Sequence, residues 1–196
     1  MEKFVKIRNN LIEEEQQNLK DTNWFCSIVI FLTTFLIVIM VLNTFVLMNI
    51  SVSGSSMNKT LNHGDVVIAN RLKEANRGDI VVLSNAEKFG PKWLIKRVIA
   101  VEGDTVMIKE GKVFLNYEEL NEPYAFGPTY VSGYMNGELI ITLQENQIFY
   151  LGDNRENSAD SRIYGTCTTE NVVCVVEDWS LNLRPITNKL FSIFSR

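Results

Sequence analysis

The sequence of 196 residues contains one histidine, three cysteines and four prolines, and this scarcity narrows the possible chemistry. One histidine cannot build a His-rich zinc site, and any nucleophile activated by histidine would have to use His63. Basic residues are also few, since 19 Lys and Arg stand against 23 Asp and Glu and give a net charge of −4. Because phosphate binding depends on clustered Lys and Arg, this balance argues against nucleic acid as a partner.

The three cysteines leave two possibilities open. Cys26 lies in an apolar stretch, whereas Cys167 and Cys174 flank a short run before a predicted strand. The last two could pair in an oxidising compartment, but a sequence does not give the distance between their Cα atoms. Buried free thiols are the simpler interpretation.

One long segment lacks charge altogether. Residues 24–50 form a run of 27 without a charged side chain, and 21 of them are apolar. A helix of about 20 residues spans the hydrocarbon layer, so this run is long enough to cross it with a tilt. A buried core helix would rarely run so far without a polar face, and a cleavable signal peptide would have a shorter apolar region followed by small residues. We therefore predict an uncleaved transmembrane anchor.

The basic residues around the anchor predict its orientation. Four of them precede it, whereas only Lys59 follows it within about 20 residues; the four are Lys3, Lys6, Arg8 and Lys20. The positive-inside rule then favours a cytoplasmic N-terminus. The predicted organisation is a cytoplasmic segment at 1–23, the anchor at 24–50 in the cell membrane, and an extracytoplasmic domain at 51–196.

Short β-rich runs, separated by turn pairs such as Glu102-Gly103, fill the chain from Ser51 onward. The predicted strands are 65–69, 79–83, 93–101, 105–108, 112–115, 139–143, 147–151 and 171–176. This pattern predicts a mainly β, antiparallel domain with loops long enough to hold a site. The apolar stretch at 186–194 is expected either to touch a membrane surface or to pack on the domain.

Three segments of this domain carry chemistry, and the first is Ser-Gly-Ser-Ser-Met-Asn-Lys-Thr-Leu at 53–61. Gly54 permits close backbone approach, and Ser56 could be presented at a turn. Small residues of this kind suit a nucleophile that must meet an extended substrate backbone. A simple spacer after a membrane helix would have the same composition.

The second segment is the predicted strand at 93–101. Its period of two places Lys96 on one face with Leu94, Val98 and Ala100. Burial among apolar neighbours lowers the pKa of a lysine, which can then act as a general base near neutral pH. The alternative is a lysine that extends to solvent at a strand edge.

The third segment, residues 152–165, directly follows an apolar strand and contains many side chains that can form hydrogen bonds and ion pairs. Such a segment suits a loop that scaffolds a site. A solvated surface loop is the alternative, although the number of Asp and Arg side chains that could pair makes it less satisfactory.

In this order, and behind an N-terminal anchor, the segments resemble bacterial type I signal peptidases in their compact Gram-positive form. The matching motifs are Ser-Gly-Ser-Ser-Met with Thr-Leu, Gly-Asp-Val-Val, Lys-Arg-Val-Ile-Ala-Val-Glu-Gly-Asp, and Gly-Asp-Asn-Arg-Glu-Asn-Ser-Ala-Asp-Ser-Arg. The resemblance implies a signal-peptidase-type antiparallel β catalytic domain with a Ser-Lys dyad. It implies no cofactor and no metal.

Transferred by motif position, Ser56 is the nucleophile, Lys96 is the general base, and the backbone N–H of Ser56 donates to the oxyanion. The resemblance also implies that Ser158 helps to orient the lysine. The supporting ion pairs that it implies are Arg97 with Asp153 and Asp160 with Arg162. The implied function is that of a monomer, in contact with membrane lipid, that removes signal peptides from secretory preproteins with small-x-small cleavage sites.

Two positions depart from the family pattern. Lys59 stands where the family usually has proline, in Ser-Met-x-Pro-Thr-Leu, and loss of that ring could loosen the loop that presents Ser56. Gly54 stands where some relatives have a serine that contributes to the oxyanion hole. This chain would then rely on backbone donors or on another group.

Three other functions compete with this interpretation. A self-cleaving Ser-Lys repressor has a related core, but the anchor and the lack of a basic DNA-binding segment argue against it. A membrane-anchored binding protein without catalysis would not need both Ser56 and Lys96. A Ser-His-Asp hydrolase would need His63, which lies only seven residues from Ser56.

Overall fold

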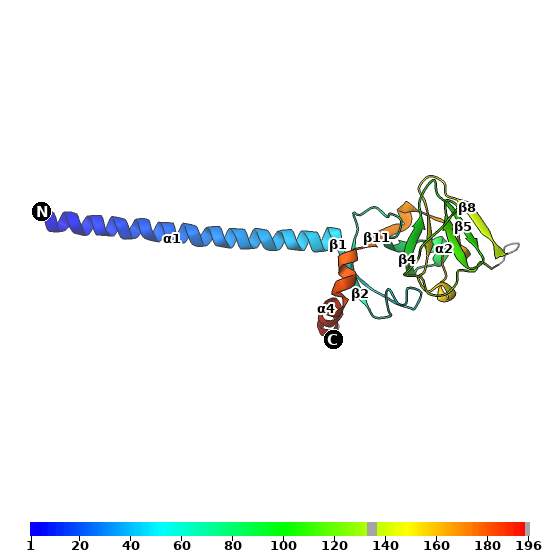
Figure 1. The fold of residues 1–196 in the computed structure, drawn as a ribbon. Helices are drawn as coiled ribbons and strands as arrows, with labels where there is room; N and C mark the ends of the chain where they lie inside the picture. The colour runs from blue at the N-terminus through cyan, green and yellow to red at the C-terminus, as the bar shows by residue number, and fades with distance from the viewer. Residues whose placement is uncertain (133–136, 195–196) are drawn as a thin grey trace. The chain divides into compact units, whose positions relative to one another are not determined.

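A computed structural model describes residues 1–132 and 137–194 of the chain. Two compact units are present, Met1–Phe45 and Val46–Arg196. The first unit is helical and the second is mainly β, as the ribbon in Figure 1 shows. The predicted fold class, an N-terminal apolar helix followed by antiparallel sheets, is confirmed.

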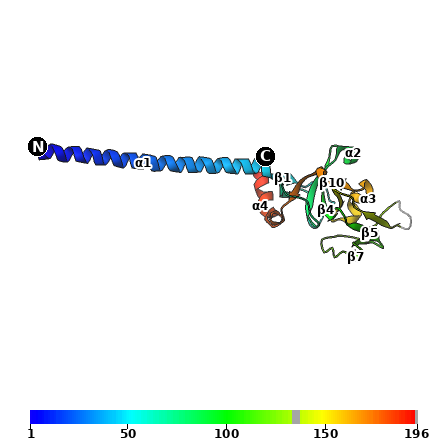
Figure 2. The same cartoon turned by 90° about the horizontal axis from the view of Figure 1, so that it is seen from above.

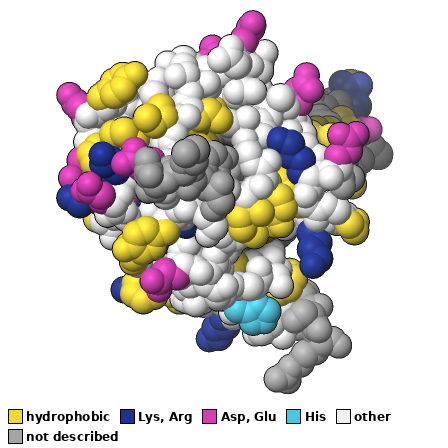
Figure 3. All heavy atoms as spheres, turned by 90° about the vertical axis from the view of Figure 1, so that its right-hand side faces the viewer, with side chains coloured by type: hydrophobic (Ala, Val, Ile, Leu, Met, Phe, Trp, Pro, Cys, Tyr) yellow, Lys and Arg dark blue, Asp and Glu magenta, His cyan; other side chains and the backbone are white. Residues whose placement is uncertain are grey.

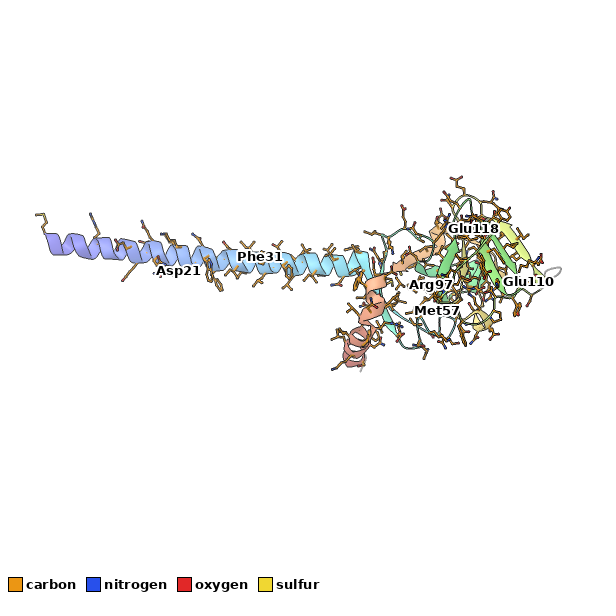
Figure 4. All side chains as sticks on the ribbon, in the orientation of Figure 1. Asp21, Phe31, Met57, Arg97, Glu110 and Glu118 are labelled. Carbon is orange, nitrogen blue, oxygen red and sulfur yellow. The ribbon has the colours of Figure 1, made fainter. Side chains whose placement is uncertain are left out.

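The N-terminal unit is formed by the long helix α1 (Glu2–Val41), which continues into a π-helical segment, η1 (Leu42–Val46). The stretch Glu13–Val46 is long and apolar enough to cross a membrane. Its apolar side chains, such as Phe31, project around the helix into open space (Figure 4). Five of its polar side chains bond to backbone carbonyls one turn earlier, namely those of Ser27, Thr33, Thr34, Asn43 and Thr44. Polar groups satisfied within the helix are compatible with hydrocarbon.

The second unit contains two antiparallel sheets. The larger has the spatial order β1 (Leu47–Ser51), β2 (Val66–Asn70), β11 (Val172–Val176), β3 (Ile80–Ser84), β4 (Trp93–Ala100), β9 (Gln147–Leu151) and β10 (Cys167–Thr168). The smaller has the order β7 (Glu118–Glu119), β6 (Lys112–Leu115), β5 (Thr105–Lys109) and β8 (Leu139–Thr142). Figure 2 shows β5 and β7 of the smaller sheet apart from β1 and β4 of the larger one.

All eight predicted strands are present, with ends that differ by one residue at most, whereas β1 and the two-residue strands β7 and β10 were not predicted. The sequence analysis placed residues 47–50 in the apolar anchor, but they pair with β2 in a continuous register from Leu47 opposite Asn70 to Ser51 opposite Val66. Ile50 is buried in the core below this pair of strands. The helical unit therefore leads into the sheet without an intervening loop.

Several short helices and one longer helix connect or follow the strands. The short ones are α2 (Ala86–Phe89), η3 (Arg155–Asn157), α3 (Ser161–Tyr164) and η4 (Thr169–Asn171). The longer one, α4 (Asp178–Phe194), contains Pro185 and was not predicted as a helix. Hydrogen bonds join it to β2, so the C-terminal stretch packs on the domain.

The core is divided into three clusters of buried apolar side chains. One lies under β1, β2 and β11, a second between β4, β9 and the smaller sheet, and a third around Tyr150. Cys167 and Cys174 are buried free thiols in the third and first clusters. Burial raises the pKa of Cys167 to about 12 and that of Cys174 to about 11, so both thiols are protonated at neutral pH.

Candidate active site

Ser56 lies in the loop between β1 and β2, and apolar residues of the same loop hold it in place. Met57 and Leu61 are fully buried in the cluster under β1 and β2. Ser56, which directly precedes Met57, is half-buried. Backbone bonds from Thr60 N and Leu61 N to Met57 O close the turn. The sequence presents Ser56 at a turn because the next residue is anchored in the core.

Lys96 comes from the middle of β4 and meets Ser56 across the loop. Its side chain is 3% exposed, and its Nζ lies 2.8 Å from Ser56 Oγ and 2.8 Å from Ile95 O. Burial lowers the pKa of Lys96 to about 8, although the carboxylates of Asp160 and Asp153 act in the opposite direction. Met57 and Arg97, the neighbours of these two residues in sequence, are labelled close together in Figure 4.

This pair of side chains can perform nucleophilic chemistry. A neutral Lys96 can donate an N–H to Ile95 O and still accept the Ser56 hydroxyl proton on its lone pair. Within the described ranges 1–132 and 137–194, no three His, Cys, Asp or Glu side chains lie close enough together to hold a metal ion. The pair itself offers a serine hydroxyl beside an amine.

Arg97 and Asp153 form the first of the two expected ion pairs. Arg97 Nε and Nη2 donate to the two oxygens of Asp153 at 2.9 and 2.7 Å, and Asp153 is fully buried. Thr60 Oγ1 donates to Asp153 Oδ2 at 2.5 Å. The guanidinium lies 4.0 Å above the centre of the Tyr124 ring. Asp153 thus joins β4 to the loop that carries Ser56.

Asp160 and Arg162 form the second pair, and it closes the loop after β9. Arg162 Nε donates to Asp160 Oδ1 at 2.8 Å, and the backbone N–H of Gly152 donates to Asp160 Oδ2 at 3.0 Å. Arg162 Nη2 also donates to Arg155 O at 2.7 Å. The buried carboxylate therefore fixes both ends of the segment between Gly152 and Asp160.

Ser158 lies close to the site, but its hydroxyl is not bonded to Lys96. Its Oγ is buried and has no hydrogen-bond partner among the residues that the structure describes. A Cβ placed on Gly152 would lie 2.6 Å from Ser158 Cβ and 2.6 Å from Ser56 O, so only glycine fits between these residues. An orienting role for Ser158 stays a prediction.

The sequence analysis gave no separate role to Asn154, which holds the nucleophile loop. Its backbone N–H donates to Ser56 O at 2.9 Å, and its Nδ2 donates to Ser55 O at 3.0 Å. Asn157 Nδ2 adds a bond to Ser55 Oγ at 2.7 Å. Position in the Gly-Asp-Asn-Arg motif was the only available signal, because pairing between distant loops is not visible in a single sequence.

A buried ion pair between Arg155 and Glu122 was also missed. Arg155 Nη2 lies 2.5 Å from Glu122 Oε1, and Arg155 Nε donates to Gly152 O at 2.9 Å. Arg155 Nη1 also bonds Thr129 Oγ1. The pair ties the segment after β9 to the loop that follows β7.

Lys59, at the expected proline position, adopts a backbone conformation that proline cannot. Its φ is +78°, in the left-handed region, whereas a proline ring fixes φ near −65°. The Lys59 ammonium lies 3.9 Å above the Phe126 ring. The local contacts, rather than a rigid ring, therefore define the shape of the loop here.

His63 is exposed (cyan in Figure 3), and it contacts the loop rather than the nucleophile. Its Nδ1 accepts the backbone N–H of Gly54 at 3.3 Å. Lys96 Nζ, and not His63, lies within hydrogen-bond distance of Ser56 Oγ. This placement disfavours a Ser-His-Asp arrangement.

A small cleft opens over the serine and the lysine. Its volume is about 150 Å³, and its walls include Ile50, Val52, Val82 and Ile95, with the half-exposed Trp93 also in its lining. The lining is mostly apolar, while Ser56 and Lys96 supply reactive groups. Small apolar side chains of an extended peptide would fit such a cleft.

A family model described as "Signal peptidase, peptidase S26" matches residues 23–179, which include every residue of this site. The chain belongs to the signal peptidase family, peptidase S26. The chain is 31% identical to signal peptidase I V of Bacillus subtilis over 146 residues, which is 68% of this chain and 85% of that protein. It is 32% identical to signal peptidase I of Bacillus caldolyticus over 155 residues, covering 71% of this chain and 82% of the relative.

Among solved structures, a signal peptidase I from Enterococcus faecalis is similar with a TM-score of 0.44 and 24% identity. The alignment covers 54% of this chain and 98% of that one. Membership of the signal peptidase family assigns the chain to enzymes with type I signal peptidase activity. The N-terminal apolar helix fits the membrane location of such enzymes.

Proposed function

We propose that this signal peptidase family member removes signal peptides from secretory preproteins with a Ser56–Lys96 dyad. The observation that carries the proposal is the 2.8 Å distance between Ser56 Oγ and the amine of a lysine that is almost completely buried. Burial supplies the neutral amine that a general base requires, since it lowers the pKa of Lys96 to about 8.

The proposed reaction proceeds through an acyl-enzyme. Ser56 Oγ attacks the scissile carbonyl while its proton moves to Lys96 Nζ, and the resulting ammonium returns the proton to the leaving amine. Lys96 then takes a proton from water, which attacks the ester and releases Ser56. The backbone N–H of Ser56 donates to the oxyanion in both steps, which lowers the activation barrier by a few kcal/mol.

The supporting residues hold these groups in position. Arg97 with Asp153, and Asp160 with Arg162, fix β4 and the loop after β9 against the nucleophile loop. We assign Ser158 an orienting role for the lysine in the reacting complex, because its buried Oγ lies beside the Gly152–Ser56 contact. All of these groups come from one chain, so the proposed active form is a monomer.

The proposed topology places residues 1–23 in the cytoplasm, the apolar helix in the membrane, and the catalytic unit outside. The excess of basic residues before the apolar helix supports this orientation. Ser56 follows Val46, the last residue of the apolar stretch, by ten positions. A signal peptide likewise presents its cleavage site just beyond an apolar segment.

The catalytic test uses the full-length chain in detergent with a secretory precursor as substrate. Ser56→Ala and Lys96→Ala should each reduce cleavage by at least about 10³-fold, because each removes a reacting group. Lys92→Ala is the matched control, because Lys92 is an exposed lysine just before β4. This variant should cleave the precursor like the wild type. Full activity of Lys96→Ala near neutral pH would exclude the dyad.

The substrate test varies the precursor instead of the enzyme. Small residues on both sides of the intervening position should be required, because the apolar cleft over Ser56 has a volume of only about 150 Å³. Replacing the two alanines of a small-x-small site by leucine should abolish cleavage, whereas the same change at the intervening position should be tolerated. Equal cleavage of all three precursors would refute the pocket.

A further inference from the structure

Helix α4 packs on the catalytic unit through polar side chains. Ser180 Oγ donates to Ile68 O at 3.1 Å, Thr187 Oγ1 donates to Val66 O at 2.7 Å, and Asn188 Oδ1 accepts from Val66 N at 2.7 Å. Arg184 lies on the same side and pairs with Asp65 at 3.1 Å. These bonds satisfy backbone groups of β2 beyond its short pairing with β11.

The outward side of α4 carries a row of apolar residues beside exposed polar ones such as Asn182 and Lys189. Trp179, Leu183, Ile186 and Leu190 follow one another at intervals of four, three and four residues, so they share one face. They are 46%, 38%, 57% and 52% exposed, respectively. We call these four residues the α4 stripe. A helix of 17 residues is about 25 Å long, and the stripe runs along most of it.

The start of α4 is tied to the place where the apolar helix ends. Val46 is the last residue of the membrane-length stretch, and its carbonyl accepts the backbone N–H of Arg71 at 2.9 Å. The adjacent Asn70 donates through Nδ2 to Glu177, the residue before α4, at 2.9 Å. Two strand spacings across the sheet and about three residues along β2, or about 15 Å, therefore separate Val46 from the beginning of α4.

A second apolar side chain lies at the same end of the sheet. Leu72 is 72% exposed, and its backbone N–H bonds to the side chain of Asn70, which also holds Glu177. Leu72 thus follows Arg71, which bonds to Val46, and shares the Asn70 side chain with Glu177, two residues before Trp179. Tryptophan at such a place suits the headgroup level of a bilayer.

We propose that α4 is an interfacial helix whose stripe inserts into the outer surface of the lipid bilayer. The proposal rests on the membrane anchoring put forward above. A lipid surface is the occupant that the contacts favour, because continuity with the apolar stretch at Val46 keeps the start of α4 within about 15 Å of the proposed hydrocarbon boundary. The anchor and α4 together would hold the catalytic unit at two places.

The test reports the environment of Trp179 in the full-length chain. The chain has three tryptophans, so Trp24→Phe with Trp93→Phe leaves Trp179 as the only one. This protein is reconstituted in vesicles of phosphatidylcholine and phosphatidylglycerol, with Ser56→Ala added so that the readout does not depend on catalysis. We expect lipid with brominated acyl chains to quench the Trp179 emission strongly and iodide to quench it weakly.

A matched control places the probe on another exposed apolar position. Ile140 is 61% exposed on β8 of the smaller sheet, and Ile140→Trp in a chain with all three native tryptophans changed to Phe supplies one reporter there. Its emission should respond to iodide and not to brominated lipid. Equal quenching of both positions by brominated lipid would indicate general adsorption and overturn the proposal.

Two further outcomes separate the possible failures. If iodide quenches Trp179 in protein that still floats with the vesicles, insertion of the α4 stripe is wrong and the membrane anchoring stands. If the protein does not float with the vesicles, the membrane anchoring and this proposal are both wrong. Trp179 shielded from both quenchers, with emission that depends on the protein-to-lipid ratio, would indicate a second copy of the chain and also overturn it.

A stripe variant gives the functional consequence. The triple variant Leu183→Ser, Ile186→Ser, Leu190→Ser should no longer show bromolipid quenching of Trp179. In a chain that keeps Ser56, the same three changes should lower cleavage of a membrane-inserted precursor several-fold. Cleavage of a short soluble peptide should stay as in the wild type, which shows that the variant is folded. Tyr117→Ser with Ile140→Ser, two exposed positions of the smaller sheet region, should change neither reaction.

Discussion

At the scale of single residues, the fold favours the neutral form of a side chain that is ordinarily a cation. Lys96 is enclosed by β4 and the nucleophile loop, and the cost of burying its charge lowers its pKa to about 8. Asp153 and Asp160 oppose this shift, but Arg97 and Arg162 neutralise their carboxylates at short distance. The two ion pairs thus brace the loops while they limit how far the carboxylates favour a charged lysine.

This pKa sets the expected pH dependence of the reaction. Only the neutral amine accepts the Ser56 proton, so kcat/KM for a peptide substrate should fall about tenfold per pH unit below the pKa of about 8 and level off above it. Initial rates between pH 6 and 10 measure this. His63→Ala should retain the same profile, since His63 bonds Gly54 and not Ser56. A midpoint that moves in that variant would contradict the assignment to Lys96.

Residue patterns indicated Ser56 and Lys96, the proposed reacting pair, but not the polar groups that hold the loops around them. The period of a strand was enough to place Lys96 among apolar neighbours, and the motif order indicated Ser56. Asn154, Thr60 and Glu122 act through bonds to residues far away in sequence, between 33 and 99 positions apart. Such bonds depend on tertiary packing, which a local pattern does not contain.

At the scale of elements, composition located strands but confused one of them with the membrane helix. Residues 47–50 are as apolar as the helix before them, because a strand at a core boundary and a membrane segment use the same side chains. Pairing with β2 decides the outcome here. Helix α4 was not predicted because its polar residues face the domain and Pro185 interrupts the helical pattern.

The segment between β9 and α3 acts as a clamp on the nucleophile loop. Asn154→Ala should reduce kcat by about 10²-fold with a much smaller change in KM, because loss of the Nδ2 bond to Ser55 O lets the serine move from its position over Lys96. Asn157→Ala removes only an exposed bond and should cost far less. Steady-state kinetics on a soluble peptide measure both variants. Equal kcat for Asn154→Ala and the wild type would show that the clamp has no catalytic role.

The same segment depends on the buried pair of Arg155 and Glu122. Glu122→Gln should lower the free energy of unfolding by about 3 to 5 kcal/mol, because it leaves a buried guanidinium without its counter-charge. Glu119→Gln breaks an exposed pair with Lys112 and should cost at most about 1 kcal/mol. Urea unfolding of the two full-length variants in detergent compares them. Equal midpoints for the two variants would contradict the prediction, because they would mean that the remaining partners of Arg155 stabilise it as well as the Glu122 carboxylate does.

At the scale of the whole molecule, the notable feature is the direct connection between the two units. The helical stretch ends at Val46 and β1 begins at Leu47, so the first strand of the catalytic sheet starts without a linker. Five residues of strand extend about 17 Å, which limits how far the start of the nucleophile loop can lie from the end of the helix. The proposed cleavage at a membrane surface would gain from such a limit.

A flexible insertion tests whether this short connection matters. Twelve Gly and Ser residues between Phe45 and Val46 add a root-mean-square span of about 20 Å to the direct chain connection between the two units. Cleavage of a membrane-inserted precursor in vesicles should then fall several-fold, because the local concentration of Ser56 at the precursor's cleavage site decreases. Cleavage of a short soluble peptide should not change, since no residue of the site is altered. The same linker placed before α1 is the control and should leave both rates intact. Unchanged precursor cleavage by the first variant would show that the connection sets no distance.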